Sequence, residues 1–291
     1  MINLSQIGVE SGPVEVRWTS DDTLLYALAL GVGAEDPLDG LEFTTENSTR
    51  VGQVVLGTYA AVIAQNAELP RNLGSVDPTR VLHAGQHLRV HRDLPVDGVA
   101  VVRQVTSAIY DKGRDALAVI DTTGHDSLSG EQLFSSTNLS YLIGEGGFGG
   151  DRGPKSVWKA PLRDPDLRVS VSTSPNQALL YRLCGDRNPL HSDPVFAQRA
   201  GFDRPILHGL VSWGIAARVI SDHFGIPGSL GSHEFSARFT TPVLPGARLI
   251  VEAWKEADDI RFRVHDDAGG LVVDEGVLAP IVASDLGQTL H

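Results

Sequence analysis

Residues 181–194, YRLCGDRNPLHSDP, form a polar turn between two expected helices. Upstream, Ser174 is followed at once by a proline and three residues later by a glutamine, a combination that predicts the start of a helix. That helix is expected to end at Gly185, because glycine accepts the left-handed backbone of a helix end. Asp193 before a proline predicts the cap of a second short helix, which ends near Gly201. The turn is therefore anchored at both ends.

The turn carries three side chains suited to acid–base chemistry, Asp186, Asn188 and His191. Each also has a structural explanation, because Asx residues before proline form turns and Asp186 could simply end the helix. On residues 186–191 alone a structural role is favoured. Gly209 changes the interpretation, since it begins an apolar helix whose first backbone N–H groups lack partners within the helix. An acid–base pair beside such donors suits enolate chemistry on a thioester.

The composition narrows the class of protein. The chain has 291 residues, 42% hydrophobic and 21% charged, which is typical of one large globular domain or two small ones. A net charge of −12 argues against a general nucleic-acid or anionic-membrane binder. Cys184 is the only cysteine, which excludes an internal disulfide and fits a reducing compartment. Because no signal-like N-terminus and no apolar run of membrane-spanning length is present, we expect a cytoplasmic location.

The order of expected elements repeats along the chain, with short capped helices, an apolar helix and then a run of strands in each half. In the first half we expect helices at 20–31 and 54–69 and strands at 81–91, 99–110, 115–123 and 132–144. In the second half we expect helices at 174–184 and 209–224 and strands near 233–241, 248–256, 259–266 and 270–282. This pattern predicts a first repeat at 1–144, a linker at 145–170 rich in Gly, Pro and charge, and a second repeat at 171–291.

Four segments together resemble a known family, the MaoC-like, type 2 (R-specific) enoyl-CoA hydratases and 3-hydroxyacyl-thioester dehydratases. They are residues 181–194, PILHGL at 205–210, GGFGG at 146–150 and RFTTPVLPG at 238–246. The first segment is specific, and the other three support it. The similarity extends from about Leu25 to Val282 and so covers nearly the whole chain.

The resemblance implies an α+β double hot-dog fold, in which an antiparallel sheet wraps around central helices. It also implies reversible hydration of a trans-2-enoyl-CoA to a (3R)-3-hydroxyacyl-CoA. In such proteins the second half keeps the catalytic turn, and the degenerate first half makes room for a long or bulky acyl chain. Asp186 and His191 would be the acid–base pair, Asn188 would orient the water or the Asp, and the Gly209 N–H would face the oxyanion. No cofactor is implied beyond the coenzyme A of the substrate, and a homodimer is expected.

Further residues are expected to contact the substrate. Arg238 could line the route of the coenzyme A, although an exposed strand arginine is an equally good explanation. Leu207 and His208 precede the apolar helix, and His208 is expected to be a cap or packed residue rather than a catalytic one. Gly147 and Phe148 belong to the glycine-rich stretch, which lacks the context of a phosphate-binding loop. The ten histidines show no metal-ligand spacing, so no metal site is predicted.

Two other functions stay open at this point. Hot-dog proteins also include thioesterases, and a non-catalytic acyl-thioester binding protein would share the architecture. The spacing of Asp186, Asn188 and His191 together with Gly209 favours the hydratase. The pattern does not decide which of Asp186 and His191 is the acid, which acyl group is used, or whether the carrier is coenzyme A or an acyl carrier protein.

Overall fold

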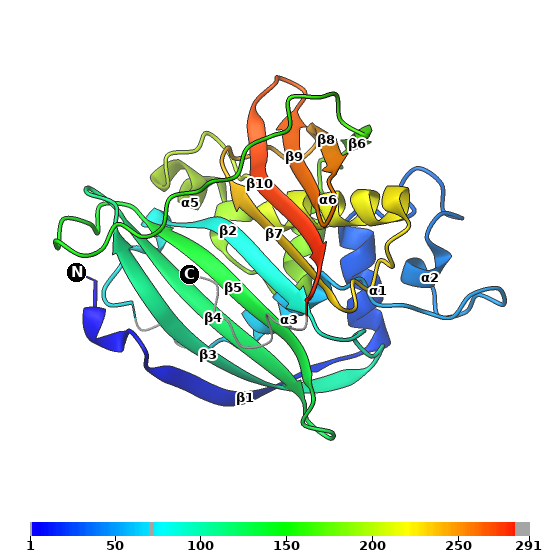
Figure 1. Cartoon of the computed structure of the whole chain (residues 1–291), viewed down its shortest axis with the longest axis horizontal. Helices are drawn as coiled ribbons and strands as arrows, with labels where there is room; N and C mark the ends of the chain where they lie inside the picture. The colour runs from blue at the N-terminus through cyan, green and yellow to red at the C-terminus, as the bar shows by residue number, and fades with distance from the viewer. Residues whose placement is uncertain (1, 70–72, 283–291) are drawn as a thin grey trace.

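The computed structural model describes residues 2–69 and 73–282, which form one ten-stranded antiparallel sheet curled around helices (Figure 1). The first half contains η1 (Leu4–Gln6), β1 (Glu10–Trp18), α1 (Ser20–Ala29), α2 (Leu41–Thr44), α3 (Tyr59–Asn66), η2 (Pro78–Arg80), β2 (Val81–Val90), β3 (Gly98–Asp111), β4 (Ala116–Asp126) and β5 (Gln132–Leu142). The second half contains β6 (Leu167–Ser172), α4 (Gln177–Tyr181), η3 (Arg182–Cys184), η4 (Pro189–His191), α5 (Pro194–Arg199), α6 (Gly209–Phe224), β7 (His233–Phe239), β8 (Arg248–Lys255), β9 (Ile260–Asp266) and β10 (Leu271–Pro280).

The strand order is β1-β3-β4-β5-β2-β7-β10-β9-β8-β6, so the two halves run outward from a shared centre with matching orders. The centre is the antiparallel pair of β2 and β7, which is in register from Gly85 opposite Arg238 to Val90 opposite His233. Backbone hydrogen bonds therefore join the halves directly, and no open sheet edge lies between them.

The second half wraps around α6, whose 16 residues include ten that are buried. In this half β7 and β9 alternate between buried and half-buried residues, as the two-residue period of a half-buried sheet requires. Gly225, with φ of 69°, ends the helix in the left-handed conformation that glycine tolerates best. In the first half α3 takes the corresponding place but is only eight residues long.

The expected strands at 81–144 and 233–282 are present, with ends shifted by a few residues. The helix expected at 54–69 begins only at Tyr59, because the chain before it runs against the second half. Gly57 donates its backbone N–H to Gly228 O at 2.9 Å, which fixes this segment against the second half. The strand β6 was not expected, and it begins inside the segment 145–170 that was interpreted as the linker.

The helix expected at 174–184 is shorter and is mixed in type. It starts at Gln177 and tightens into a 3₁₀ turn before it stops at Gly185, where the end was expected. Gln177 reaches back to the Ser174 N–H at 2.8 Å, as in the glutamine half of a capping box. Asp193 caps α5 as expected, since its carboxylate accepts from the N–H of Val195 at 2.8 Å. Within the described residues, no helix combines the length and the apolar character needed to cross a membrane.

The contact at Gly57 generates a stability prediction. A Cβ placed on Gly57 would lie 2.1 Å from the Ser229 carbonyl oxygen, a backbone atom that cannot swing aside. Gly57→Ala should therefore lower the free energy of unfolding in urea by at least about 2 kcal/mol. Gly52→Ala is the control, because a Cβ there meets no atom within 4 Å. Equal unfolding midpoints for the two variants would contradict this account of how the halves pack.

Candidate active site

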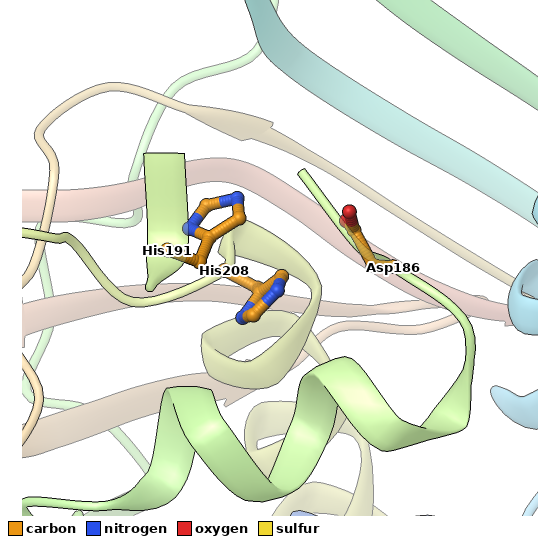
Figure 2. Close-up of side chains that lie close together, drawn as sticks. All are labelled: Asp186, His191 and His208. Atoms are coloured by element: carbon orange, nitrogen blue, oxygen red, sulfur yellow. The ribbon is translucent and has the colours of Figure 1, made fainter. Parts of the chain in front are cut away.

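Asp186, His191 and His208 converge on one point of the structure (Figure 2). One ionisable atom from each side chain lies within 4.8 Å of the other two. Asp186 follows the end of η3, His191 ends η4, and His208 is the residue before α6. The turn at 181–194 and the start of the central helix are thus brought together, as the sequence predicted for Asp186, His191 and Gly209.

The turn that carries Asp186 is held by the first half of the chain. Asn66, the last residue of α3, donates its Nδ2–H to the Cys184 carbonyl at 2.9 Å. The next residue, Gly185, has φ of 137°, and a Cβ there would lie 1.8 Å from Asn66 Oδ1. Glycine is therefore required twice, for its backbone angle and for the approach of Asn66.

Asn188 stabilises the same turn. Its backbone N–H donates to Asp186 Oδ1 at 3.1 Å, and its side-chain oxygen accepts from the Leu190 N–H at 3.1 Å. The second bond is the cap of the short helix η4. The turn-forming explanation offered for Asn188 is thus realised, and the residue also lines the cavity described below.

The surroundings of Asp186 favour its charged form. Burial alone would raise the pKa of this carboxyl. The imidazole of His208, a hydrogen bond from the Gln65 side chain, the imidazole of His191 and the Asn188 N–H together outweigh burial and hold the pKa below its usual value. Asp186 is therefore a carboxylate near neutral pH.

His191 has one ring nitrogen committed and one available. Its Nδ1 lies 2.9 Å from the Ile206 carbonyl oxygen, which can only accept, so Nδ1 carries the proton and Nε2 keeps its lone pair. Burial lowers the pKa of His191, and this effect exceeds the opposing influence of Asp186 and of the Ile206 bond. The ring is therefore neutral near neutral pH and able to accept a proton at Nε2.

The imidazole ring of His208 packs against that of His191. The two rings stack with centroids 3.6 Å apart and planes 26° apart. His208 is only 2% exposed, and burial together with His191 lowers its pKa to about 3. A neutral ring can pack closely on His191, which agrees with the expected packing role. The stacking also disfavours a shared metal ion, because nearly parallel rings direct their lone pairs side by side instead of toward one atom.

A cavity of about 650 Å³ opens in front of these groups. The expected site residues that line it are Asp186, Asn188, His191, Leu207, His208 and Gly209. Thr240, Thr241 and Pro242 are exposed and line it too, so the cavity opens to solvent there. Gly209 is the first residue of α6, and a Cβ there would lie 3.2 Å from the Phe239 ring. The start of α6, where helical N–H groups commonly lack partners within the helix, therefore lines the cavity that Asp186 and His191 share.

Three residues expected to contact the substrate lie elsewhere. Gly147 donates its N–H to the carboxylate of Asp111 at 3.0 Å, and Phe148 packs on a small apolar cluster of the first half. Neither lines the cavity. Arg238 points to the outer face of the sheet, where it lines a second cavity of about 320 Å³. Its Nε lies 3.7 Å from the Glu275 carboxylate, so a phosphate there would have to compete with that partner.

Two positioning residues were missed by the sequence interpretation, Gln65 and Asn66. Both end α3 in the first half, far in sequence from the turn that they contact. Their positions at the end of an apolar helix gave no signal, because a polar helix end commonly faces water.

Two domain families match the chain. The MaoC like domain matches residues 157–277, and the MFE-2 hydratase 2 N-terminal domain matches residues 17–144. Among curated relatives, 3-hydroxyacyl-thioester dehydratase Y of Mycobacterium tuberculosis is 41% identical over 258 residues, which cover 87% of this chain and 88% of the relative. Enoyl-CoA hydratase ChsH3 of the same organism is 39% identical over 255 residues, covering 86% and 88% of the two chains. The probable enoyl-CoA hydratase 2 of Dictyostelium discoideum is 36% identical and covers 84% and 83%.

Solved structures agree with this assignment. A MaoC-like dehydratase from Phytophthora capsici superposes with a TM-score of 0.84 at 26% identity, covering 97% of this chain and 99% of the other. A Mycobacterium tuberculosis protein described as having a double hotdog fold superposes with a TM-score of 0.60 at 16% identity, covering 94% and 96%. The expected double hot-dog architecture is therefore confirmed. The chain belongs to the MaoC-like hydratase and dehydratase family, as its four signature segments predicted.

Proposed function

We propose that this protein is a hydro-lyase that reversibly adds water to a trans-2-enoyl-CoA and forms a (3R)-3-hydroxyacyl-CoA. One observation carries the proposal: a carboxylate and a neutral imidazole lie within 4.8 Å of each other on a solvent-connected cavity, beside the start of α6. That separation suits a single water molecule, because two hydrogen bonds of about 2.8 Å at an open angle span it.

The reaction follows from the protonation states. Asp186 and His191 both rest without the transferable proton, so one of them takes a proton from the water as its oxygen bonds to the β-carbon. The electron pair of the double bond moves toward the thioester carbonyl, whose oxygen becomes negative. The N–H of Gly209 stabilises that oxygen. The same proton then passes to the α-carbon, so that water supplies both added atoms and the two side chains are regenerated.

Other features of the proposal rest on the family. Coenzyme A is the proposed carrier, since relatives are named enoyl-CoA hydratases, and no separate cofactor is needed for the steps above. We further propose repeats at 1–144 and 171–291 with a linker at 145–170, a homodimer, and a cytoplasmic location. A size measurement in solution and imaging of the tagged protein would test the last two.

The acid–base pair generates the first activity prediction. Asp186→Asn and His191→Asn should each lower kcat on crotonyl-CoA by more than about 100-fold, because each removes a proton acceptor and leaves a polar side chain that still fits the site. Hydration is followed as loss of enoyl absorbance without release of free thiol. Asp222→Asn and His223→Asn are matched controls, because both side chains are exposed in the last turn of α6. Release of thiol by the wild-type protein would instead indicate a thioesterase.

The pKa directions generate a second prediction. Hydration needs Asp186 charged and His191 neutral, and both pKa values lie below their ordinary values. Activity should therefore stay level as the pH falls from neutral to about 6.5, the ordinary imidazole pKa, and decline only below it. The measurement is kcat/KM on crotonyl-CoA against pH. A rate that rises as the pH falls through 6.5 would mean that a protonated imidazole is required, against this proposal.

The oxyanion role of Gly209 can be isolated with two substitutions at the same position. Gly209→Pro removes the N–H, and proline is tolerated at the first helical position, where His208 before it is already extended with ψ of 134°. Gly209→Ala keeps the N–H and brings a similar Cβ toward Phe239. The proline variant should have a kcat about 100- to 1000-fold below that of the alanine variant. Equal rates would show that the N–H is not a donor to the reacting oxygen.

A further inference from the structure

The cavity extends from the acid–base pair into the first half, where its wall is polar. Gln104 on β3, Thr122 on β4 and Ser136 on β5 are direct register partners across the three strands. They are 8%, 5% and 6% exposed, and all three line the cavity. We refer to the space in front of these three residues as the polar chamber.

The second half shows that the fold does not need this chamber. There Val251, Val264 and Val273 form a row of register partners on β8, β9 and β10, the strands that correspond to β3, β4 and β5 in the sheet order. All three are fully buried and belong to the same apolar core as α6. The contrast follows from helix length, because α6 has 16 residues and α3 only eight (Figure 1). The sheet of the first half is therefore left partly uncovered, and polar side chains occupy the uncovered part.

Some polar side chains in and around the chamber are hydrogen-bonded to one another. Gln86 donates its Nε2–H to Ser136 Oγ at 2.7 Å, and the side chain of Asn138 contacts His83 Nε2 at 2.8 Å. In the part of the chain that the structure describes, the Gln104 carboxamide and the Thr122 hydroxyl have no such partner. Buried polar groups are normally paired, and leaving one unpaired against an apolar ligand weakens binding.

The depth of the chamber decides which part of a thioester reaches it. The bulky, charged head of coenzyme A stays in solvent, so its arm must leave by the mouth at Thr240, Thr241 and Pro242, which are exposed. Gln104 and Thr122 are buried on β3 and β4, which lie four and three strands away from β7, the strand that ends at the mouth. The group that extends past the reacting carbons is the acyl chain.

We propose that the acyl group of the substrate carries an oxygen function, a hydroxyl or a carbonyl, away from the thioester, and that Gln104 and Thr122 bind it. This inference rests on the proposed hydratase function. A carboxamide and a hydroxyl can each donate and accept, so the pair suits either oxygen function. A plain alkyl chain of the same length would bury both groups unpaired. Gln104 and Thr122 thus determine specificity without touching the reacting atoms.

The test compares binding of matched thioesters that cannot react. Saturated medium-chain acyl-CoAs and their ω-hydroxy and ω-oxo counterparts are titrated calorimetrically against the wild type, Thr122→Val and Gln104→Leu. The wild type should bind an oxygenated chain about tenfold or more tightly than the plain chain, and each variant should lose most of that preference by gaining affinity for the plain chain. Thr123→Val is the matched control, because Thr123 is the next residue of β4 and faces the other side of the sheet.

Several results would overturn the inference. One is equal or tighter wild-type binding of the plain chain across the series, and another is a preference for oxygen that survives in both variants. A third is weaker binding of butyryl-CoA by Thr122→Val and Gln104→Leu, which would place the coenzyme A arm in the chamber. Crotonyl-CoA turnover by the wild type is measured in parallel. Absence of turnover would contradict the proposed hydration. The binding comparison would still test whether Gln104 and Thr122 bind an oxygen function of the acyl group.

Discussion

The hydrogen bond from Asn66 to the Cys184 carbonyl joins the two halves of this molecule at the turn that carries Asp186. It can form only because Gly185 lacks a Cβ and adopts a backbone angle that other residues avoid. Gln65, one residue earlier, bonds to Asp186 itself. The first half, which lacks an acid–base turn of its own, thereby sets the position and the charge of the carboxylate in the second.

Burial favours the neutral form of both key groups, so it raises the pKa of Asp186 and lowers that of His191, and the neighbours decide the outcome. It favours the neutral form of His191, and the hydrogen bond to Ile206 orients the ring without restoring the charge. For Asp186 burial also favours the neutral form, but hydrogen bonds and imidazoles outweigh it. The result is two proton acceptors side by side, which is the condition that the proposed mechanism requires.

The two halves share one architecture but differ in the length of the helix that packs against the sheet. In the second half a long helix fills the sheet and places its first N–H groups at the cavity. In the first half the short α3 leaves space, and the uncovered strands present Gln104 and Thr122 to it. One architecture used twice therefore gives one half with a filled core and one half with a cavity, and the β2–β7 pair holds them in register.

Much of this protein is determined by local sequence signals. Asp193 before proline specifies a helix start, Gly185 a helix end, and the two-residue alternation most of the strands, because these patterns act through neighbouring residues alone. The sequence also singled out Asp186, His191 and Gly209, which line one cavity in the structure. The strand β6 was not predicted, because its short sequence, LRVSVS, lies beside a segment rich in Gly and Pro.

Only the tertiary structure decided the rest. Asn66 reaches Gly185 across a long stretch of chain, and no local pattern encodes that distance. On β3 Gln104 shares the buried face with Ala100 and Val102, yet this polar side chain faces a cavity and not packed apolar side chains. Alternation specifies two faces of a strand but not which one is covered. The length of the helix packed against the sheet decides that, and it is a property of the assembled fold.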